Sequence, residues 1–343
     1  MAEFAVELEE VSKRYGNFEA VTDIELAIRK GEFFSILGPS GSGKTTILRL
    51  IAGLIFPDKG KIKLMGEDCT FLPPYKRNIG MVFQDLALFP HLNVFENVAY
   101  GLRVRKIPES EIKRRVLECL EIVNLDPRTF AKRKINQLSG GQQQRVAIAR
   151  ALAIEPAVLL LDEPLGSLDL KLRQHMMTEL KRIQKNVKTT FVYVTHDQTE
   201  ALVMSDRLAV INCGKLEQIG TPIEVYEKPK NKFVAEFIGE MNFIEADVCE
   251  DRLISEIGEI KARVNGLRKV VIGIRPEKIK IGGDTENVFR GKIEEKIFLG
   301  GQVKITVNVN GIEIKCLTNH NGFREGDEIE IGWNSEEVAI FEA

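Results

Sequence analysis

The feature that most constrains the fold of this chain is a glycine-rich segment between two apolar runs. It follows residues 33–37, which predict a buried strand, and precedes residues 47–53, which predict a helix. Glycines let a backbone wrap closely around a phosphate, and successive N–H groups and a helix start supply positive charge. The segment consists of Gly38, Pro39, Ser40, Gly41, Ser42, Gly43, Lys44, Thr45 and Thr46. The alternative is a turn that binds nothing, but the flanking strand and helix favour a site for a nucleoside triphosphate.

This pattern also assigns two side chains to the ligand. In G-x-x-x-x-G-K-[ST], the lysine reaches the β- and γ-phosphates and the hydroxyl of the next residue ligates Mg2+. Here these residues are Lys44 and Thr45. We therefore expect a nucleoside triphosphate to bind with Mg2+.

Composition limits the class of protein. Over 343 residues, 44% are hydrophobic and 29% charged, which is typical of a soluble globular protein with room for two domains. The formal net charge of −2 gives no general basic signature for nucleic acid. Apolar runs such as residues 157–161 are too short to span a bilayer, and the acidic start lacks the apolar core of a signal peptide. We expect a cytoplasmic protein unless a partner holds it at a membrane.

Cysteines and histidines do not predict a structural metal. The five cysteines form no C-x-x-C pair, and the four histidines show no metal-ligand spacing. In a cytosolic chain such cysteines are expected to be free thiols.

A second glycine-rich segment predicts another anion site. Ser139, Gly140, Gly141 and Gln142 precede a helical run that continues to Leu152. A serine N-cap and two glycines at the start of a long helix leave backbone N–H groups directed at a ligand.

Two carboxylates follow the apolar strand predicted at residues 158–161. Asp162 can hold the hydration shell of Mg2+, while Glu163 can polarise an attacking water. A strand that ends in an acidic turn without a function is the alternative. The phosphate loop and the second glycine-rich segment favour the hydrolytic interpretation.

Three further polar or aromatic residues are candidates by position. His196 follows the strand predicted at residues 190–194, and ligands lie at the carboxyl ends of strands in parallel sheets. Gln84 ends the apolar run 79–83, and Tyr15 lies in a turn where an adenine ring could stack on it. Each also has an ordinary structural explanation as a buried histidine, a polar strand end or a surface tyrosine.

Together these residues resemble a known family. The phosphate loop, Gln84, the segment Leu138-Ser139-Gly140-Gly141-Gln142, the Asp162-Glu163 pair and Thr195-His196-Asp197 occur in the order and approximate spacing of ATP-binding-cassette (ABC) proteins. Leu-Ser-Gly-Gly-Gln after a phosphate loop is highly specific. The chain is similar, over about residues 4–238, to the ATP-hydrolysing subunit of an ABC transporter.

The resemblance implies a head-to-tail homodimer with two ATP molecules at its interface. Residues 38–46 of one copy would hold the phosphates, and Ser139, Gly140, Gly141 and Gln142 of the other would cover the γ-phosphate. This is electrostatic stabilisation that is assembled only on closure.

The resemblance also implies roles for single residues. Glu163 would act as general base or water-positioning group, and His196 would contact the γ-phosphate. Gln84 would sense Mg2+ and nucleotide and link the site to residues 86–98, which in the family border a groove for a short helix of the membrane subunit. Tyr15 would stack on the adenine.

One segment departs from the family pattern. Relatives usually have Ser-Asn-Leu-Asp or Ser-Ala-Leu-Asp after the acidic pair, whereas this chain has Gly166-Ser167-Leu168-Asp169. We expect Gly166 to loosen a loop that crosses the dimer interface.

The C-terminal part predicts a separate small β domain. Alternation at residues 305–309 and turns at Asn310-Gly311 and Asn321-Gly322 are typical of strands and hairpins. Residues 273–277 and 298–300 resemble landmarks of the OB-like (TOBE) barrel appended to ATPases of maltose, polyamine and ferric-ion importers. The predicted fold is α/β, with an ABC ATPase domain at 1–238, a helical subdomain at about 94–153 and an all-β regulatory domain at 239–343.

The resemblance to importers implies the partners. These are integral membrane permease subunits that hold the chain at the cytoplasmic face of the membrane and, indirectly, an external solute-binding protein. Polyamine is the first expectation for the solute, with ferric ion, an oxyanion or a sugar as alternatives that the sequence leaves open.

A soluble ABC ATPase that acts on nucleic acid or ribosomes is the rival interpretation. The stretch between Lys44 and Ser139 has no heptad array, and the chain has a single phosphate loop. From Gly239 onward, 14 Lys and Arg face 20 Asp and Glu, which is a poor surface for phosphates. We therefore expect no nucleic-acid partner.

Overall fold

The computed structural model describes residues 3–166, 168–249, 252–262 and 269–342. Its contacts divide the chain into two units, Met1–Ile223 and Glu224–Ala343. Each unit has hydrophobic clusters of its own. Among the described residues, no helix is both long enough and apolar enough to cross a membrane.

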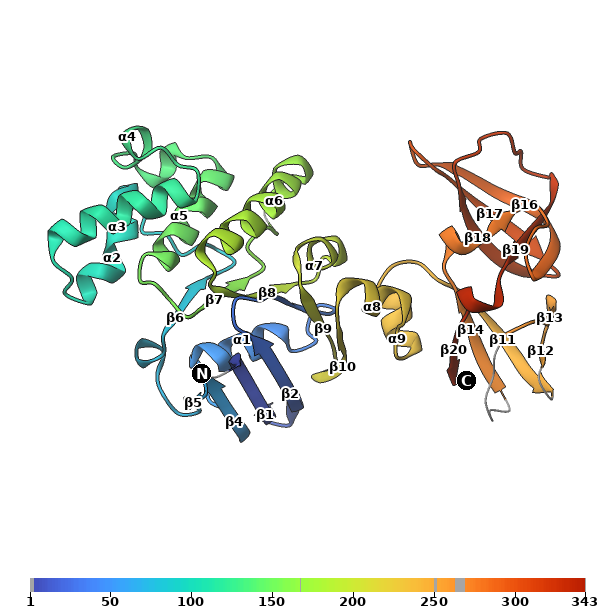
Figure 1. The fold of residues 1–343 in the computed structure, drawn as a ribbon, viewed down its shortest axis with the longest axis horizontal. Helices are drawn as coiled ribbons and strands as arrows, with labels where there is room; N and C mark the ends of the chain where they lie inside the picture. Colours follow the sequence, from blue (N-terminus) through green and yellow to red (C-terminus); the bar gives the residue numbers. More distant parts are fainter. Residues whose placement is uncertain (1–2, 167, 250–251, 263–268, 343) are drawn as a thin grey trace. The chain divides into compact units, whose positions relative to one another are not determined.

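The first unit is built on a sheet with the strand order β10-β9-β3-β8-β7-β6 (Figure 1). All neighbours in it are parallel except β10, which pairs antiparallel with β9. The strands are β3 (Phe33–Leu37), β6 (Ile79–Val82), β7 (Val158–Asp162), β8 (Thr190–Thr195), β9 (Arg207–Asn212) and β10 (Lys215–Gly220). Every residue of β3, β7 and β8 is buried, because both faces of the sheet are covered.

Alternating residues of these strands face two different cores. Phe33 and Leu159 pack in a cluster with the long helices, while Phe34 and Leu160 pack in a second cluster with α1 (Lys44–Ala52). This alternation follows from the period of two in a strand.

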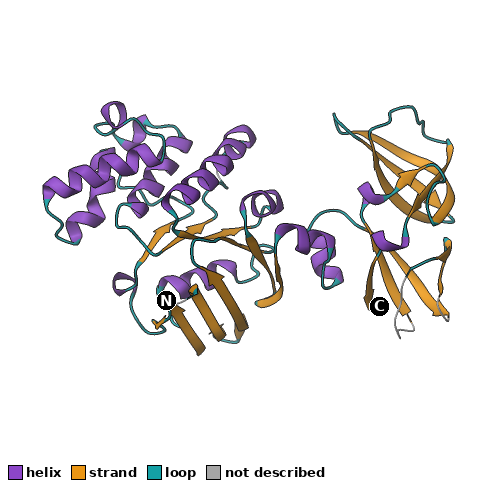
Figure 2. Cartoon of the chain, viewed as in Figure 1, coloured by secondary structure: helices purple, strands orange, loops and turns teal. Residues whose placement is uncertain are grey.

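A second, antiparallel sheet covers α1 from the other side. Its order is β2-β1-β4-β5, and Figure 2 shows α1 between the two sheets. The strands are β1 (Phe4–Tyr15), β2 (Phe18–Arg29), β4 (Lys59–Leu64) and β5 (Glu67–Asp68). Val6 and Ile24 of this sheet share a cluster with Ile47 of α1 and Ile36 of β3.

Helices cover the opposite face of the central sheet. They are α2 (Val94–Val104), α3 (Glu109–Ile122), α4 (Pro127–Phe130), α5 (Gly140–Leu152), α6 (Leu170–Val187) and α7 (Gln198–Met204). Sequence signals set their starts: Asn93 caps α2 through a capping box with Glu96, and Ser139 caps α5 in the same way with Gln142.

The described residues of the second unit form two antiparallel sheets, ordered β13-β12-β11-β14-β20 and β15-β19-β16-β17-β18. Trp333 and Phe289 stack in its core with ring centroids 5.0 Å apart. The elements are α8 (Pro222–Glu227), α9 (Lys232–Phe237), β11 (Asn242–Cys249), β12 (Arg252–Ser255), β13 (Gly258–Ile260), β14 (Lys269–Ile274), β15 (Lys280–Ile281), β16 (Asn287–Phe298), β17 (Val303–Val309), β18 (Ile312–Thr318), β19 (Glu328–Trp333) and β20 (Ala339–Glu342). Single 3-10 turns occur at Pro74–Lys76, Ile135–Gln137, Pro276–Lys278 and Ser335–Glu337.

The fold class predicted from the sequence is confirmed. An α/β phosphate-loop domain with a helical part is followed by an all-β domain. Asn310 and Gly311 form the predicted turn between β17 and β18, and both have positive φ, as a two-residue type I′ hairpin requires.

Arg275 explains why the division between the units comes at 223/224, ahead of the boundary at 238/239 expected from the sequence. Its Nη1 donates to the carbonyl oxygens of Ala235 (3.0 Å) and Glu240 (3.1 Å), and its Nη2 donates to that of Tyr226 (3.1 Å). The guanidinium also lies 4.2 Å from the ring centroid of Tyr226. These contacts attach α8 and α9 to the β domain.

We predict that Arg275→Met destabilises the second unit by roughly 2–4 kcal/mol, because three carbonyl oxygens lose a charged donor. Hydrogen exchange of the α8 and α9 amides should accelerate in the full-length variant. Arg252→Met, which removes only an exposed ion pair with Glu259, is the control and should leave this exchange unchanged. Equal protection of both helices in wild type and Arg275→Met would contradict this account.

Candidate nucleotide-hydrolysis site

The phosphate loop joins β3 to α1, and its glycines are required by close backbone contacts. A Cβ on Gly38 would lie 2.2 Å from the carbonyl oxygen of Ile211, and one on Gly43 would lie 2.4 Å from that of Ala20. Gly41 and Gly43 also have φ values of +78° and +103°. At Gly38 and Gly43 no side chain fits without moving the backbone, while Gly41 has open space around it but a left-handed backbone that favours glycine.

The ammonium group of Lys44 lies over this loop, where a phosphate could replace its present hydrogen-bond acceptors. This group donates to the carbonyl oxygens of Gly38 (2.9 Å) and Pro39 (2.8 Å), and the residue is only 4% exposed. Burial lowers the pKa of Lys44, while Glu163 and Asp162 act in the opposite direction. A phosphate would give this buried cation an anionic partner in place of neutral carbonyls.

Ser42 provides an independent test of whether the loop fits a ligand. Its hydroxyl oxygen is buried and has no hydrogen-bond partner within the part of the chain that the structure describes. Buried hydroxyls are normally satisfied, so the orphaned group indicates a ligand atom beside it. The loop therefore fits a phosphate group.

Residues that could hold Mg2+ lie beside the loop. Thr45 donates its hydroxyl hydrogen to Asp162 over 3.3 Å, and burial raises the pKa of that carboxyl group. Among the described residues there is no cluster of three or more His, Cys, Asp and Glu that could hold a metal by itself. This donor set suits a hard cation that takes its other ligands from phosphates and water.

The candidate catalytic residues follow neighbouring parallel strands. β3, β8, β7 and β6 lie side by side, and their carboxyl ends lead to the phosphate loop, His196, Asp162-Glu163 and Gln84 respectively. The structure thus brings these sequence-predicted residues to one edge of the sheet.

Glu163 and His196 contact each other at this edge. Nδ1 of His196 lies 3.1 Å from a carboxylate oxygen of Glu163, and the histidine side chain is 54% exposed. Glu163 has a φ of +43°, held by a hydrogen bond from its N–H to the carbonyl oxygen of Val194 (3.0 Å). Left-handed backbone in a non-glycine residue is strained, and such strain is common at functional sites.

The second glycine-rich segment lies elsewhere in the same copy. Ser139 and Gln142 bond each other's backbone at the start of α5; Ser139 is exposed and Gln142 is partly buried. Figure 1 and the two clusters place α1 and α5 on opposite faces of the central sheet. Within one copy, Ser139 therefore does not join the phosphate loop.

Tyr15 and Gln84 are both accessible. Tyr15 ends β1, is 47% exposed, and has the ammonium of Lys13 5.9 Å from its ring centroid. Gln84 is exposed in the turn after β6. A free aromatic face can stack on a base, and a free amide can reach a bound ligand.

Gly166 follows the acidic pair without a special backbone conformation. It is not among the positive-φ glycines, and an added Cβ would make only an ordinary contact of 3.5 Å with the carbonyl oxygen of Glu163. A side chain would fit, so glycine here adds freedom and relieves no clash. Ser167, which belongs to the same expectation, lies outside the described residues.

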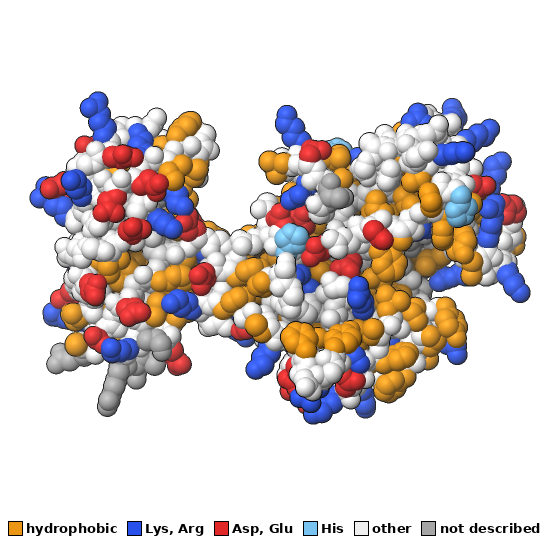
Figure 3. All heavy atoms as spheres, turned by 180° about the vertical axis from the view of Figure 1, so that it is seen from behind, with side chains coloured by type: hydrophobic (Ala, Val, Ile, Leu, Met, Phe, Trp, Pro, Cys, Tyr) orange, Lys and Arg blue, Asp and Glu red, His pale blue; other side chains and the backbone are white. Residues whose placement is uncertain are grey.

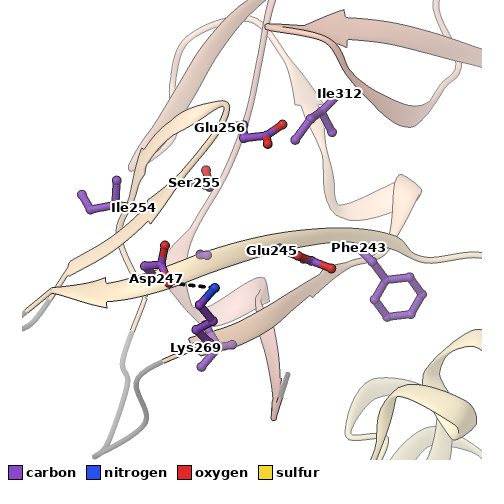
Figure 4. A pocket seen from close by; sticks show the side chains of 10 residues that line it. Phe243, Glu245, Asp247, Ile254, Ser255, Glu256, Lys269 and Ile312 are labelled. Atoms are coloured by element: carbon purple, nitrogen blue, oxygen red, sulfur yellow. Dashed lines mark ion pairs between the residues drawn. The ribbon is translucent and has the colours of Figure 1, made fainter.

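A pocket in the second unit is separate from this chemistry. It has a volume of about 670 Å³, and Figure 4 shows Glu245, Asp247 and Glu256 at its wall, with Lys269 paired to Asp247 over 3.8 Å. It contains none of the residues that the sequence predicted to bind nucleotide.

Sequence reasoning missed the buried polar residues behind His196. Glu200 is 3% exposed and accepts hydrogen bonds from the hydroxyls of Tyr193 and Thr195, each at 2.6 Å. Arg173 of α6 contacts Asp197 on the other side of the histidine. The available signal was a glutamate early in a helix that directly follows a strand, which the sequence does not distinguish from a surface residue.

Family models match both units. One described as "ABC transporter" matches residues 21–166, and one described as "TOBE domain" matches residues 272–341. The spermidine/putrescine import ATP-binding protein PotA of Thermobifida fusca is 48% identical over 97% of this chain and 92% of its own length. The chain belongs to the ABC transporter family.

Other members support this ABC assignment. The PotA protein of Clostridioides difficile is 46% identical over 99% of this chain and 98% of its own length. Among solved structures, the dimeric ABC transporter cassette MJ0796 is 39% identical with a TM-score of 0.56, covering 63% of this chain and 98% of that one. The cbiO1 protein of Clostridium perfringens is 32% identical with a TM-score of 0.61, covering 65% and 90%.

We predict that Lys44→Ala weakens ATP binding by roughly 10- to 100-fold, since charged hydrogen bonds to phosphate oxygens are lost. Titration with a fluorescent ATP analogue would measure the change. Lys30→Ala, in the exposed turn between β2 and β3, is the control and should bind like wild type. An unchanged dissociation constant for Lys44→Ala would place the phosphates elsewhere.

Proposed function

We propose that this chain is the ATP-hydrolysing subunit of an importer for polyamines such as spermidine and putrescine. The observation that carries the proposal is nearly full-length similarity to proteins named spermidine/putrescine import ATP-binding protein, including the PotA protein of Thermotoga maritima, 45% identical over 98% of both chains. The similarity extends through the C-terminal domain as well as the cassette.

ATP binds with its phosphates in the loop 38–46 and its adenine on Tyr15. Lys44 neutralises the β- and γ-phosphates, and the orphaned hydroxyl of Ser42 acquires a partner. Thr45, Asp162 and Gln84 hold Mg2+ directly or through water. The magnesium ion supplies positive charge for the phosphoryl oxygens.

Hydrolysis uses the edge formed by β7 and β8. Glu163 orients and polarises the attacking water, and His196, held by Glu163 at 3.1 Å, donates a hydrogen bond to the γ-phosphate. Because Ser139 lies away from the phosphate loop of its own copy, the site is completed by Ser139, Gly140, Gly141 and Gln142 of a second, head-to-tail copy. Closure excludes water and assembles these donors at once.

An exposed apolar surface fits a membrane permease as the next partner. The residues after α1 and around the 3-10 turn at 74–76 expose Leu54, Phe56, Phe71, Leu72 and Tyr75, of which Phe71 is 72% and Tyr75 82% exposed. The ring centroids of Phe56 and Phe71 lie 6.0 Å apart. Figure 3 shows hydrophobic side chains gathered on this part of the first unit. Exposed apolar patches of this kind mark interaction sites. The permease holds the chain at the cytoplasmic face of the membrane and receives the solute from an external binding protein.

The importer hypothesis predicts a specific complex. Purified from its native cells in mild detergent, the chain should be accompanied by a stoichiometric polytopic membrane protein, and vesicles containing both should accumulate spermidine when ATP is present. Phe71→Ser should reduce this transport at least about tenfold, since a central apolar contact is lost. Phe298→Ser, the same change at a residue 66% exposed in the second unit, is the control and should transport normally. Copurification of ribosomes or nucleic acid instead would refute the transport role and leave the ATPase chemistry intact.

A further inference from the structure

Arg173 connects two loops that lie on different sides of the proposed catalytic residues. It lies in the first turn of α6, four residues after the N-cap Asp169, which accepts a hydrogen bond from the N–H of Leu172. Its Nη2 donates to the carbonyl oxygen of Leu168 at 3.1 Å, and its Nη1 contacts Asp197 at 3.2 Å. One guanidinium thus joins the loop that follows Glu163 to the loop that contains His196.

The backbone on both sides of His196 is fixed by this set of contacts. Before it, the hydroxyl of Thr195 donates to Glu200 and accepts from the N–H of Asp197 at 2.9 Å. After it, Asp197 caps α7 by accepting from the N–H of Glu200 at 3.1 Å. The peptide of His196 is therefore held between two anchored residues.

The two carboxylate oxygens of the buried Glu200 have different hydrogen-bond partners. One oxygen accepts both short hydrogen bonds from the β8 hydroxyls of Tyr193 and Thr195. The other faces Nε of Arg173 at 3.9 Å, which is too long for a hydrogen bond. The Nε itself is buried and has no hydrogen-bond partner among the residues that the structure describes.

These contacts leave room for a second arrangement of the network. In it, the buried Nε of Arg173 would donate a hydrogen bond to the carboxylate oxygen of Glu200 that it now faces. A shift of the guanidinium by about 1 Å would form the missing bond, and the desolvated donor makes that bond favourable. The shift has to involve α6 or the loop before it, because Leu168 and Asp197 hold the other two nitrogens. That loop follows Glu163, and Gly166 has no side chain to restrict its own backbone.

We propose that Arg173 is a positioning residue that transmits closure of the dimer to His196. The proposal rests on the two-copy site of the proposed function. A second copy that presses on Leu168 and Asp169 moves the start of α6, brings Nε of Arg173 onto Glu200, and sets the peptide of His196 in the position that contacts the γ-phosphate. ATP binds at the phosphate loop and Tyr15, whereas Arg173 contacts Leu168, Asp197 and Glu200, so Arg173 acts on turnover and not on affinity.

The test compares Arg173→Met and Arg173→Lys in the full-length chain. Arg173→Met should lower kcat for ATP hydrolysis roughly 10- to 100-fold and leave KM within about twofold of wild type. The reason is that a misplaced His196 slows the reaction but does not weaken the binding of ATP. Arg173→Lys keeps the charge near Asp197 but not the planar fork, so its kcat should lie between those of Arg173→Met and wild type.

A matched control lies on the same helix. Arg182 also donates to a carbonyl oxygen, that of Ile122 (3.1 Å), pairs with a carboxylate, Glu179 (3.2 Å), and has a buried Nε without a partner in the described chain. It lies away from both loops, so Arg182→Met should cost stability without a comparable loss of kcat. Thermal unfolding of both variants separates a general loss of packing from the specific effect.

A dimerisation assay separates this inference from the proposed function. In Glu163→Gln, saturating ATP should trap a dimer in size exclusion, and adding Arg173→Met should leave that dimer intact. Wild-type kcat in Arg173→Met would overturn the inference alone. Loss of kcat together with ATP affinity and the trapped dimer would also overturn it, because Arg173 would then only hold the fold. If Glu163→Gln itself stays monomeric with ATP, the closure on which both proposals rest does not occur.

Discussion

The close packing of backbone around the phosphate loop is the constraint on which the rest of the structure depends. At Gly38 and Gly43 the loop lies so near β9 and β2 that no side chain can be accommodated. Neighbouring strands therefore fix the backbone of the loop at these two glycines. Since β8, β7 and β6 extend the same parallel sheet from β3, the residues at their carboxyl ends, His196, Asp162 and Gln84, lie along the same sheet edge as the loop. The site is a consequence of strand order.

The same sheet also separates the two anion-binding segments. α1 packs on one face with the small antiparallel sheet, and α5 packs on the other with the remaining helices. Each segment has its own helix N-terminus, but a single copy cannot direct both at one phosphate. A two-copy site resolves this, because each chain then contributes its phosphate loop to one site and Ser139 to the other.

Local sequence signals predicted the parts of this protein that local chemistry determines. The glycines of the phosphate loop, the capping box at Ser139 and the hairpin at Asn310-Gly311 are each specified within a few residues. Arg173 and Arg275 could not be recognised in this way. Each bonds to groups more than one element away, and an arginine in a sequence resembles any surface cation until the fold brings its partners together.

The central claim, that each ATP is held between two copies, is tested most directly by mixing two inactive variants. Lys44→Ala disables the phosphate loop, and Ser139→Ala disables the segment that the partner contributes. A mixed dimer contains one site with both defects and one with neither. The account predicts that the mixture recovers ATPase activity, up to about a quarter of the wild-type rate if the copies pair at random. A mixture no more active than its two components would show that each site is built within one chain, which would contradict the account.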